Sequence, residues 1–268
     1  MSSYRSLHDL PPLAGVCNFT EAQRPGLSVE ECVLRLKRYH YALKRSHQIL
    51  NNRIPSEAVY ELKMTFSLHA HYCAEHVASL RKRVGEMREP PLGLETVPDE
   101  NLEILFDEIL SAPSTGELLM GLYEIALPAV ENAMRMHLKD TNPLVDHPSI
   151  RIIRFALLEI DEMIALGQAS IQSLVDQESR TDATAWLETL ENCLSNAGGL
   201  AGVNAQSEKP IHKKYSSNSF VYDGTPKRDE RFPDPFNMGV NAETFLYDES
   251  FAPEPKTLMM FYKRLREI

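Results

Sequence analysis

Several common sequence features are missing from this chain, and each absence excludes a class of protein. The cysteines are scattered without a CxxC pair, which indicates neither a disulfide framework nor a zinc knuckle; they are Cys17, Cys32, Cys73 and Cys193. No stretch approaches the roughly 18 apolar residues of a membrane helix. The N-terminus lacks the charged start and apolar run of a signal peptide. We therefore expect a cytoplasmic protein that does not have a membrane as a partner.

An excess of basic charge is missing as well. The 268 residues include 38 acidic and 28 basic side chains, which gives a net charge of −10. Phosphate binding needs clustered Lys and Arg, so nucleic acid is not expected as a partner. No P-loop, dinucleotide fingerprint or Ser–His–Asp order is present either. The apolar fraction of 43% is that of an ordinary globular protein.

What the chain does contain is a series of long helical patterns with clear boundaries. The capping box Ser28–Glu31 opens the first helix, and Pro55 separates it from the second by so short a link that the two must form an antiparallel hairpin. A second capping box, Ser114–Glu117, opens the third helix, in which Pro128 predicts a kink. Pro148 occupies the first position of the fourth. The four expected helices span 28–53, 56–86, 114–138 and 148–176.

The same patterns divide the chain into three parts. Residues 1–27 are irregular and form an N-terminal arm. Residues 28–197 form an all-α four-helix bundle with a long crossover, and further short helices are expected near 100–110 and 182–195, the latter ended by Gly198 and Gly199. Residues 198–268 change to a composition without helical period and form an extended C-terminal segment that ends in a short helix after Pro255.

Ionisable residues lie on the stripes that the bundle is expected to bury. Apolar residues three and four positions apart mark such a stripe. In the fourth helix the best stripe has no ligand, but the apolar neighbours of Glu159 predict that this carboxylate is buried too. Burying these groups without partners costs several kcal/mol each, so partners are required. The candidate residues are His40, His69, His76, Glu124, Glu131 and Glu159.

Counting from the turns places most of these residues in one layer. A hairpin centred near residue 54 puts His40 level with His69, about 21 Å from the turn at 1.5 Å per residue. A crossover along the full bundle makes the third helix parallel to the second and brings Glu124 level with His69. Glu159 falls between Glu124 and Glu131 in height. The layer is therefore predicted to contain residues from all four helices, with a second pair, His76 and Glu131, one layer away.

Two interpretations of this layer remain open. Imidazole and carboxylate are the usual ligands of iron, manganese and zinc, and bundle interiors are where such sites are built. The alternative is a metal-free network in which each glutamate accepts a hydrogen bond from a histidine ring. The sequence thus predicts either an iron or manganese site or no cofactor at all.

The chain also resembles the ferritin-like superfamily. The resemblance is carried by Leu68–His76 for the second helix, by Leu157–Ile164 for the fourth, and by tail segments 228–232, 238–243 and 263–267, which are similar to bacterial proteins with two ferritin-like halves. The resemblance implies a ferritin-like four-helix bundle and a di-iron site with Glu-x-x-His motifs. This chain departs from that ligand set, with Cys73 at the bridging position and with Ile160 and Met163 on the fourth helix.

These departures favour a single ion over a pair of irons, because histidines are neutral and cannot replace the missing carboxylates. The first functional hypothesis is therefore an oxidoreductase or oxygenase that uses one iron or manganese ion on a small organic substrate. The second is a metal-free helical scaffold or interaction module with a degenerate ferritin-like core, which binds a partner protein. A homodimer is compatible with both hypotheses.

Overall fold

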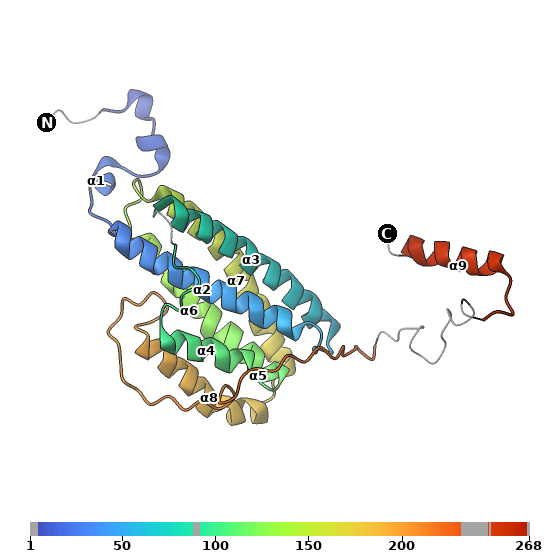
Figure 1. Cartoon of the computed structure of the whole chain (residues 1–268). Coiled ribbons are helices and arrows are strands. Elements are labelled where there is room, and N and C mark those ends of the chain that lie inside the picture. The colour runs from blue at the N-terminus through green and yellow to red at the C-terminus, as the bar shows by residue number, and fades with distance from the viewer. Residues whose placement is uncertain (1–4, 88–91, 232–245, 247, 267–268) are drawn as a thin grey trace.

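The computed structural model describes residues 5–87, 92–231, 246 and 248–266, and every regular element in these ranges is helical (Figure 1). The all-α prediction is therefore confirmed. The N-terminal arm contains only short elements, η1 (Leu7–Asp9), η2 (Leu13–Gly15) and α1 (Phe19–Ala22).

Four long helical segments pack in a ring. α2 lies against α3, α3 against α7, α7 against the α5–η3–α6 segment, and α6 returns to α2. Their apolar stripes meet in one continuous core that includes Leu36, Phe66 and Ile160. The bounds are α2 (Val29–Arg53), α3 (Tyr60–Met87), α5 (Thr115–Met120), η3 (Gly121–Ala126), α6 (Leu127–Asp140) and α7 (His147–Leu174).

The predicted start signals act as expected. The Ser28 hydroxyl accepts a hydrogen bond from the Glu31 amide at 3.2 Å, and the Glu31 carboxylate accepts one from the Ser28 amide at 2.8 Å. Ser114 caps α5 through the Glu117 amide. These bonds satisfy amides at the first turn, which have no partner within the helix.

Contacts between helices fix their directions. His69 of α3 contacts Tyr123 of η3, and Arg83 at the far end of α3 contacts Asp146 beyond the end of α6. The third helical segment therefore runs parallel to α3, as the crossover predicted. At Pro128 the sequence predicted a kink, and the structure has a π-helical turn, η3, just before this residue. The ring nitrogen of Pro128 cannot donate a hydrogen bond to the carbonyl of residue 124.

The register of the first hairpin differs from the prediction. Six residues, 54–59, separate α2 from α3, because α3 begins at Tyr60 and not at residue 56. The ring of His47 lies 2.9 Å from the carbonyl oxygen of Ala70. In an antiparallel pair, His40 is therefore level with Val77 and not with His69. The prediction that His40 and His69 share a layer is wrong by about two helical turns.

The third segment buries part of the predicted stripe, including Met134, but not its glutamates. The residues just before the two candidate glutamates, Tyr123 and Val130, are fully buried, whereas Glu124 and Glu131 are only partly buried. The prediction that Glu124 and Glu131 lie on the buried stripe is therefore wrong.

A second layer covers one side of the ring. α4 (Glu100–Leu110) packs on α2, and α8 (Gln177–Asn196) packs on α4 and η3. Gly121 permits this close approach, because a Cβ there would lie 2.8 Å from the Trp186 ring. α8 ends at Gly198 and Gly199, both with positive φ, as predicted.

After α8 the chain returns across the bundle as an irregular strap, residues 200–231. Its main anchor is the fully buried carboxylate of Glu108, which accepts hydrogen bonds from the amides of residues 214, 215 and 216 and from the Trp186 indole. The strap ends beside α3, where Asp229 accepts a hydrogen bond from the Tyr60 amide and Arg231 pairs with Glu61. The last helix, α9 (Pro253–Arg266), stands apart from the bundle (Figure 1).

Candidate functional site

The predicted ligand His69 is buried in the bundle interior with a tyrosine as its partner. Its Nδ1 lies 2.8 Å from the Tyr123 hydroxyl oxygen, and the two rings are edge-to-face. Burial lowers the pKa of His69 to about 4 and raises that of Tyr123. Gly167 of α7 makes room for the tyrosine, because a Cβ there would lie 2.1 Å from the Tyr123 ring. This pair is neutral at physiological pH.

His76 lies two turns further along α3 and faces a predicted carboxylate. Its Nε2 is 2.7 Å from Glu159 Oε2 of α7. The glutamate side chain is 36% exposed, so the prediction that Glu159 is buried is wrong. Burial lowers the pKa of His76, while the nearby Glu159 opposes that shift. Cys73 is buried between His69 and His76 on the same stripe, and burial raises the pKa of its thiol to about 12.

His40 is separate from both pairs. Its side chain is 1% exposed, and neither ring nitrogen has a hydrogen-bond partner among the described residues. Burial, together with the charges of Lys44 and Arg81, lowers the pKa of His40 to about 4. It is therefore a neutral, buried histidine without a hydrogen-bond partner among the described residues, close to charged side chains.

The two glutamates of the third segment are engaged at the surface. Glu124 accepts hydrogen bonds from Arg180 of α8 at 2.7 and 3.2 Å. Glu131 pairs with Arg135, one turn later on the same helix, and Arg135 also binds Asp161. Both carboxylates are thus partly solvated ion-pair members.

The six predicted ligands therefore occupy five separate places. In the described part of the chain, one group of three residues brings metal-ligand atoms within 4.8 Å of one another, and it contains none of the six: Cys32, His137 and Asp146. Sequence reasoning missed this group because Cys32 lies 105 residues before His137, and only the fold joins them.

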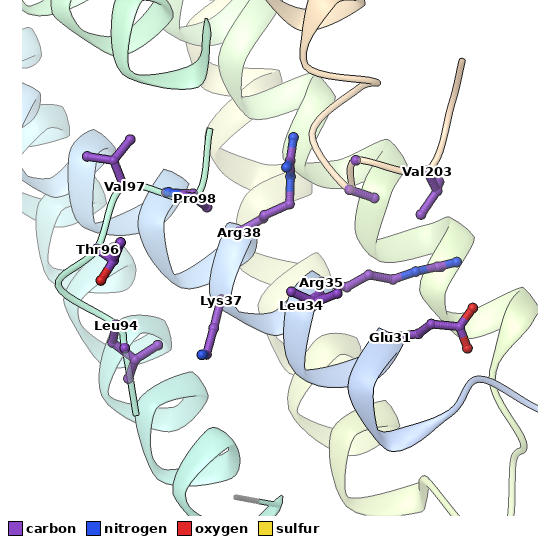
Figure 2. Close-up of a pocket in the computed structure, with 13 residues that line it drawn as sticks. Glu31, Leu34, Arg35, Lys37, Arg38, Leu94, Thr96, Val97, Pro98 and Val203 are labelled. Atoms are coloured by element: carbon purple, nitrogen blue, oxygen red, sulfur yellow. The ribbon is translucent and has the colours of Figure 1, made fainter. Parts of the chain in front are cut away.

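A hollow of about 600 Å³ lies where α2 faces the segments 93–98 and 201–203. It contains three basic residues of α2, but Figure 2 shows Arg35, Lys37 and Arg38 pointing in different directions. Arg35 pairs with Asp140, and Arg38 donates to the carbonyls of residues 197 and 200. Two of the three basic side chains are thus held by contacts within the fold. The three do not point to a common position in the hollow where an anion could bind.

An open groove of about 790 Å³ runs between the start of α3 and the end of α7. Its walls are mainly apolar, and the strap residues 228–231 form one rim; the wall residues include Ala58, Leu62, Leu166, Ala169 and Leu174. Large apolar side chains continue the surface along α3, where Met64 is 55% and Leu68 46% exposed. We call this surface the α3–α7 groove.

The α9 helix presents a second exposed apolar surface. Leu258 is 72% exposed, Met260 56% and Phe261 66%. Leu258 and Phe261 are three residues apart and so share one side of the helix. Over residues 253–261, the part of α9 whose burial is described, no side chain is buried, whereas buried contacts stabilise most helices in proteins.

Comparison with known proteins gives no relative: no family model, curated protein or solved structure matches this chain. In the ranges that the structure describes, no helix is long and apolar enough to span a membrane.

Proposed function

We propose that this chain is a helical interaction module, a scaffold that associates with a partner by binding an amphipathic helix in the α3–α7 groove. The observation that carries the proposal is the contiguous exposed apolar surface of the groove, formed by two adjacent helices. Helix-in-groove recognition uses such surfaces, with apolar anchors spaced along one side of the bound helix. The chemistry of the occupant is therefore an amphipathic helix with large apolar anchors.

The helix that fits this description within the chain is α9, and we assign it, from a second copy, as the occupant. The strap ends at the rim of the groove, at Arg231, and 21 residues separate that point from Pro253. An extended segment of that length spans up to about 70 Å. Each copy can thus pass its α9 to the other, which forms a closed two-fold dimer.

Charge supports the same pairing. The α9 sequence contains one acidic and four basic residues, whereas the whole chain has an excess of ten acidic residues. The groove lining contains three acidic residues, Glu61, Asp229 and Glu230, and two basic ones, Arg228 and Arg231. Opposite charges at the rim of an interface accelerate encounter and fix orientation.

We further propose that the bundle is a degenerate ferritin-like one. Two antiparallel hairpins joined by a crossover support this proposal. The interior contains the neutral His69–Tyr123 pair and the buried Cys73 in the region where a di-iron bundle needs bridging carboxylates. That composition favours a scaffold over an orthodox di-iron enzyme.

The test is the oligomeric state in sedimentation velocity at micromolar concentrations. We expect the full chain to form a dimer and the variant Leu258→Glu/Phe261→Glu to be a monomer, because two carboxylates cannot enter an apolar groove without a large desolvation cost. Leu34→Glu, at a 62% exposed apolar position of α2, is the matched control and should leave the dimer intact. A wild-type monomer at all concentrations would refute the assignment of a second copy.

A second candidate function is a metal-dependent oxidoreductase in the bundle interior. The observation that favours it is the spacing of His69, Cys73 and His76, which places three candidate ligands on one buried stripe of α3 beside Glu159. A mononuclear iron or manganese ion would take its ligands from these groups. Iron or manganese retained by the purified protein, and lost in His76→Gln, would support this candidate.

A further inference from the structure

A second buried polar cluster lies at the end of the bundle opposite the α3–α7 groove. Cys32 belongs to the first turns of α2, His137 to the last turn of α6, and Asp146 is the residue that precedes α7. Their exposed fractions are 3%, 0% and 6%. The two proposals for the bundle and the groove make no use of this cluster.

One oxygen atom is the centre of the cluster. Asp146 Oδ2 lies 3.6 Å from Cys32 Sγ, 3.1 Å from His137 Nε2 and 2.9 Å from the Thr141 hydroxyl. Three donors thus converge on an oxygen with two lone pairs. This oxygen therefore faces one donor more than its two lone pairs accept well.

The distances match those between the ligands of a tetrahedral zinc ion. Bonds of about 2.3 Å to sulfur and about 2.0 Å to nitrogen and oxygen place sulfur about 3.5 Å from oxygen, and nitrogen about 3.3 Å from oxygen. The observed separations are 3.6 and 3.1 Å. All three ligand atoms lie within 4.8 Å of one another. Two of the three separations therefore match those of a zinc site, and the third, from Cys32 Sγ to His137 Nε2, is below 4.8 Å.

The surroundings also fit such an ion. The second carboxylate oxygen, Asp146 Oδ1, lies 3.3 Å from Arg83, and Arg83 in turn donates to Ser149 at 2.8 Å. Ligating carboxylates are commonly held by outer partners in this way. A thiolate and a carboxylate would neutralise a divalent ion, which removes the cost of a net charge in a buried site.

We propose that Cys32, His137 and Asp146 bind one zinc ion, with the Thr141 hydroxyl or a water molecule in the fourth position. The thiolate and imidazole ligands favour zinc over manganese or magnesium, which prefer oxygen. The site is closed, with no exposed ligand, and so is structural. It joins α2, α6 and α7, and through Arg83 also α3, at one end of the bundle.

Binding releases a proton, and its source is Cys32. The groups that face the thiol are Asp146, Thr141 and Arg35 of its own helix. Burial and the neighbouring Asp146 raise the pKa of this thiol to about 11. Zinc takes the thiolate, so the S–H proton leaves to solvent, and it takes the Nε2 lone pair of His137.

The experiment is a titration of the full chain, stripped with a chelator, with ZnCl₂ and separately with CoCl₂. We expect one ion per chain, a thiolate-to-cobalt charge-transfer band, and a higher Tm with zinc. Cys32→Ser should abolish the band and weaken zinc binding by more than about 100-fold, beyond the loss typical of an outer partner. Arg83→Gln should weaken it by about tenfold. Cys193→Ser, at another fully buried cysteine, is the control and should keep both the band and the affinity.

The wild-type cobalt spectrum keeps the test independent of whether the variants fold. No bound ion, or bound cobalt without a thiolate band, would overturn the proposal. Binding that survives Cys32→Ser and is lost in His76→Gln would also overturn it, and would assign the ion to the bundle interior instead.

Discussion

The two ends of the α3–α7 pair differ in whether their side chains have partners within the fold. At one end Arg83, Ser149 and Asp146 form a closed polar cluster with partners from four helices. At the other end the groove leaves Leu166 44% and Leu174 48% exposed. The bundle is therefore completed internally at its polar end, whereas its apolar end leaves a surface that we propose another helix covers. Stability should therefore depend on the first end and association on the second.

The largest expected effect is that of acid on the middle of the bundle, between these ends. Buried His40 and His69 have pKa values of about 4 in the folded chain, against 6.5 for the free group. As the pH falls, the histidines of the unfolded chain take up protons before those of the folded chain. The free energy of unfolding is therefore highest above pH 6.5 and decreases as the pH falls towards 4. Urea unfolding should show a loss of about 4 kcal/mol from pH 6.5 to 4.5.

The closed end should resist acid longer. Burial alone would raise the pKa of Asp146, but hydrogen bonds from His137, Ser149 and Thr141 outweigh it and lower the value to about 2, from 3.8. This contribution is therefore present above pH 3.8 and is lost only between pH 3.8 and 2. A stability profile that is flat from pH 6.5 to 4.5 would contradict this order.

The next effect concerns the centre of the closed end. Asp146→Ala leaves Arg83 and His137 buried without their carboxylate, which should lower the free energy of unfolding by about 3–5 kcal/mol in the presence of a chelator. Asp161→Ala is the matched control, because its ion pair with Arg135 is 45% exposed on both sides and should contribute less than about 1 kcal/mol. Equal effects of the two variants would remove the distinction between a closed and an open end.

A smaller change of opposite sign is expected at His40. His40→Leu replaces two unsatisfied buried nitrogens with an apolar side chain, so the free energy of unfolding should rise by about 1 kcal/mol at pH 7. The same variant should halve the slope of stability against pH below 6.5. A decrease in stability at pH 7 would indicate that the ring has a partner in solution.

The smallest effect on stability is expected at the open end. Leu68→Ser should change the free energy of unfolding of the monomer by less than about 0.5 kcal/mol, because the side chain is 46% exposed. The same change should weaken dimerisation measurably. A large loss of monomer stability would show that Leu68 is part of the core and not of a binding surface.

The sequence predicted the helices well because their boundary signals are local. Ser28, Ser114 and Pro148 each act within one helical turn, and each marks a helix start in the structure. It failed on the facing of Glu124 and Glu131, which find Arg180 and Arg135 at the surface while the neighbouring Tyr123 and Val130 face the core. It also failed on the level of His40, since the length of a turn cannot be read from a proline alone.

The polar clusters could not be predicted because their members are far apart in sequence. Glu108 looks like a surface residue of an amphipathic helix, yet it anchors strap residues more than 100 positions later. Cys32 and Asp146 likewise meet only when α2 and α7 are packed. Helical periodicity identifies which side of a helix is buried, but not which distant group will lie opposite.

The most direct test of the interaction proposal is hydrogen exchange of the α9 backbone amides at several protein concentrations. If α9 binds the α3–α7 groove of a second copy, its amides should be protected at micromolar concentrations and become unprotected on dilution, together with those at the end of α7. The variant Leu258→Glu/Phe261→Glu should be unprotected throughout. Rapid exchange of wild-type α9 at every concentration would contradict the account.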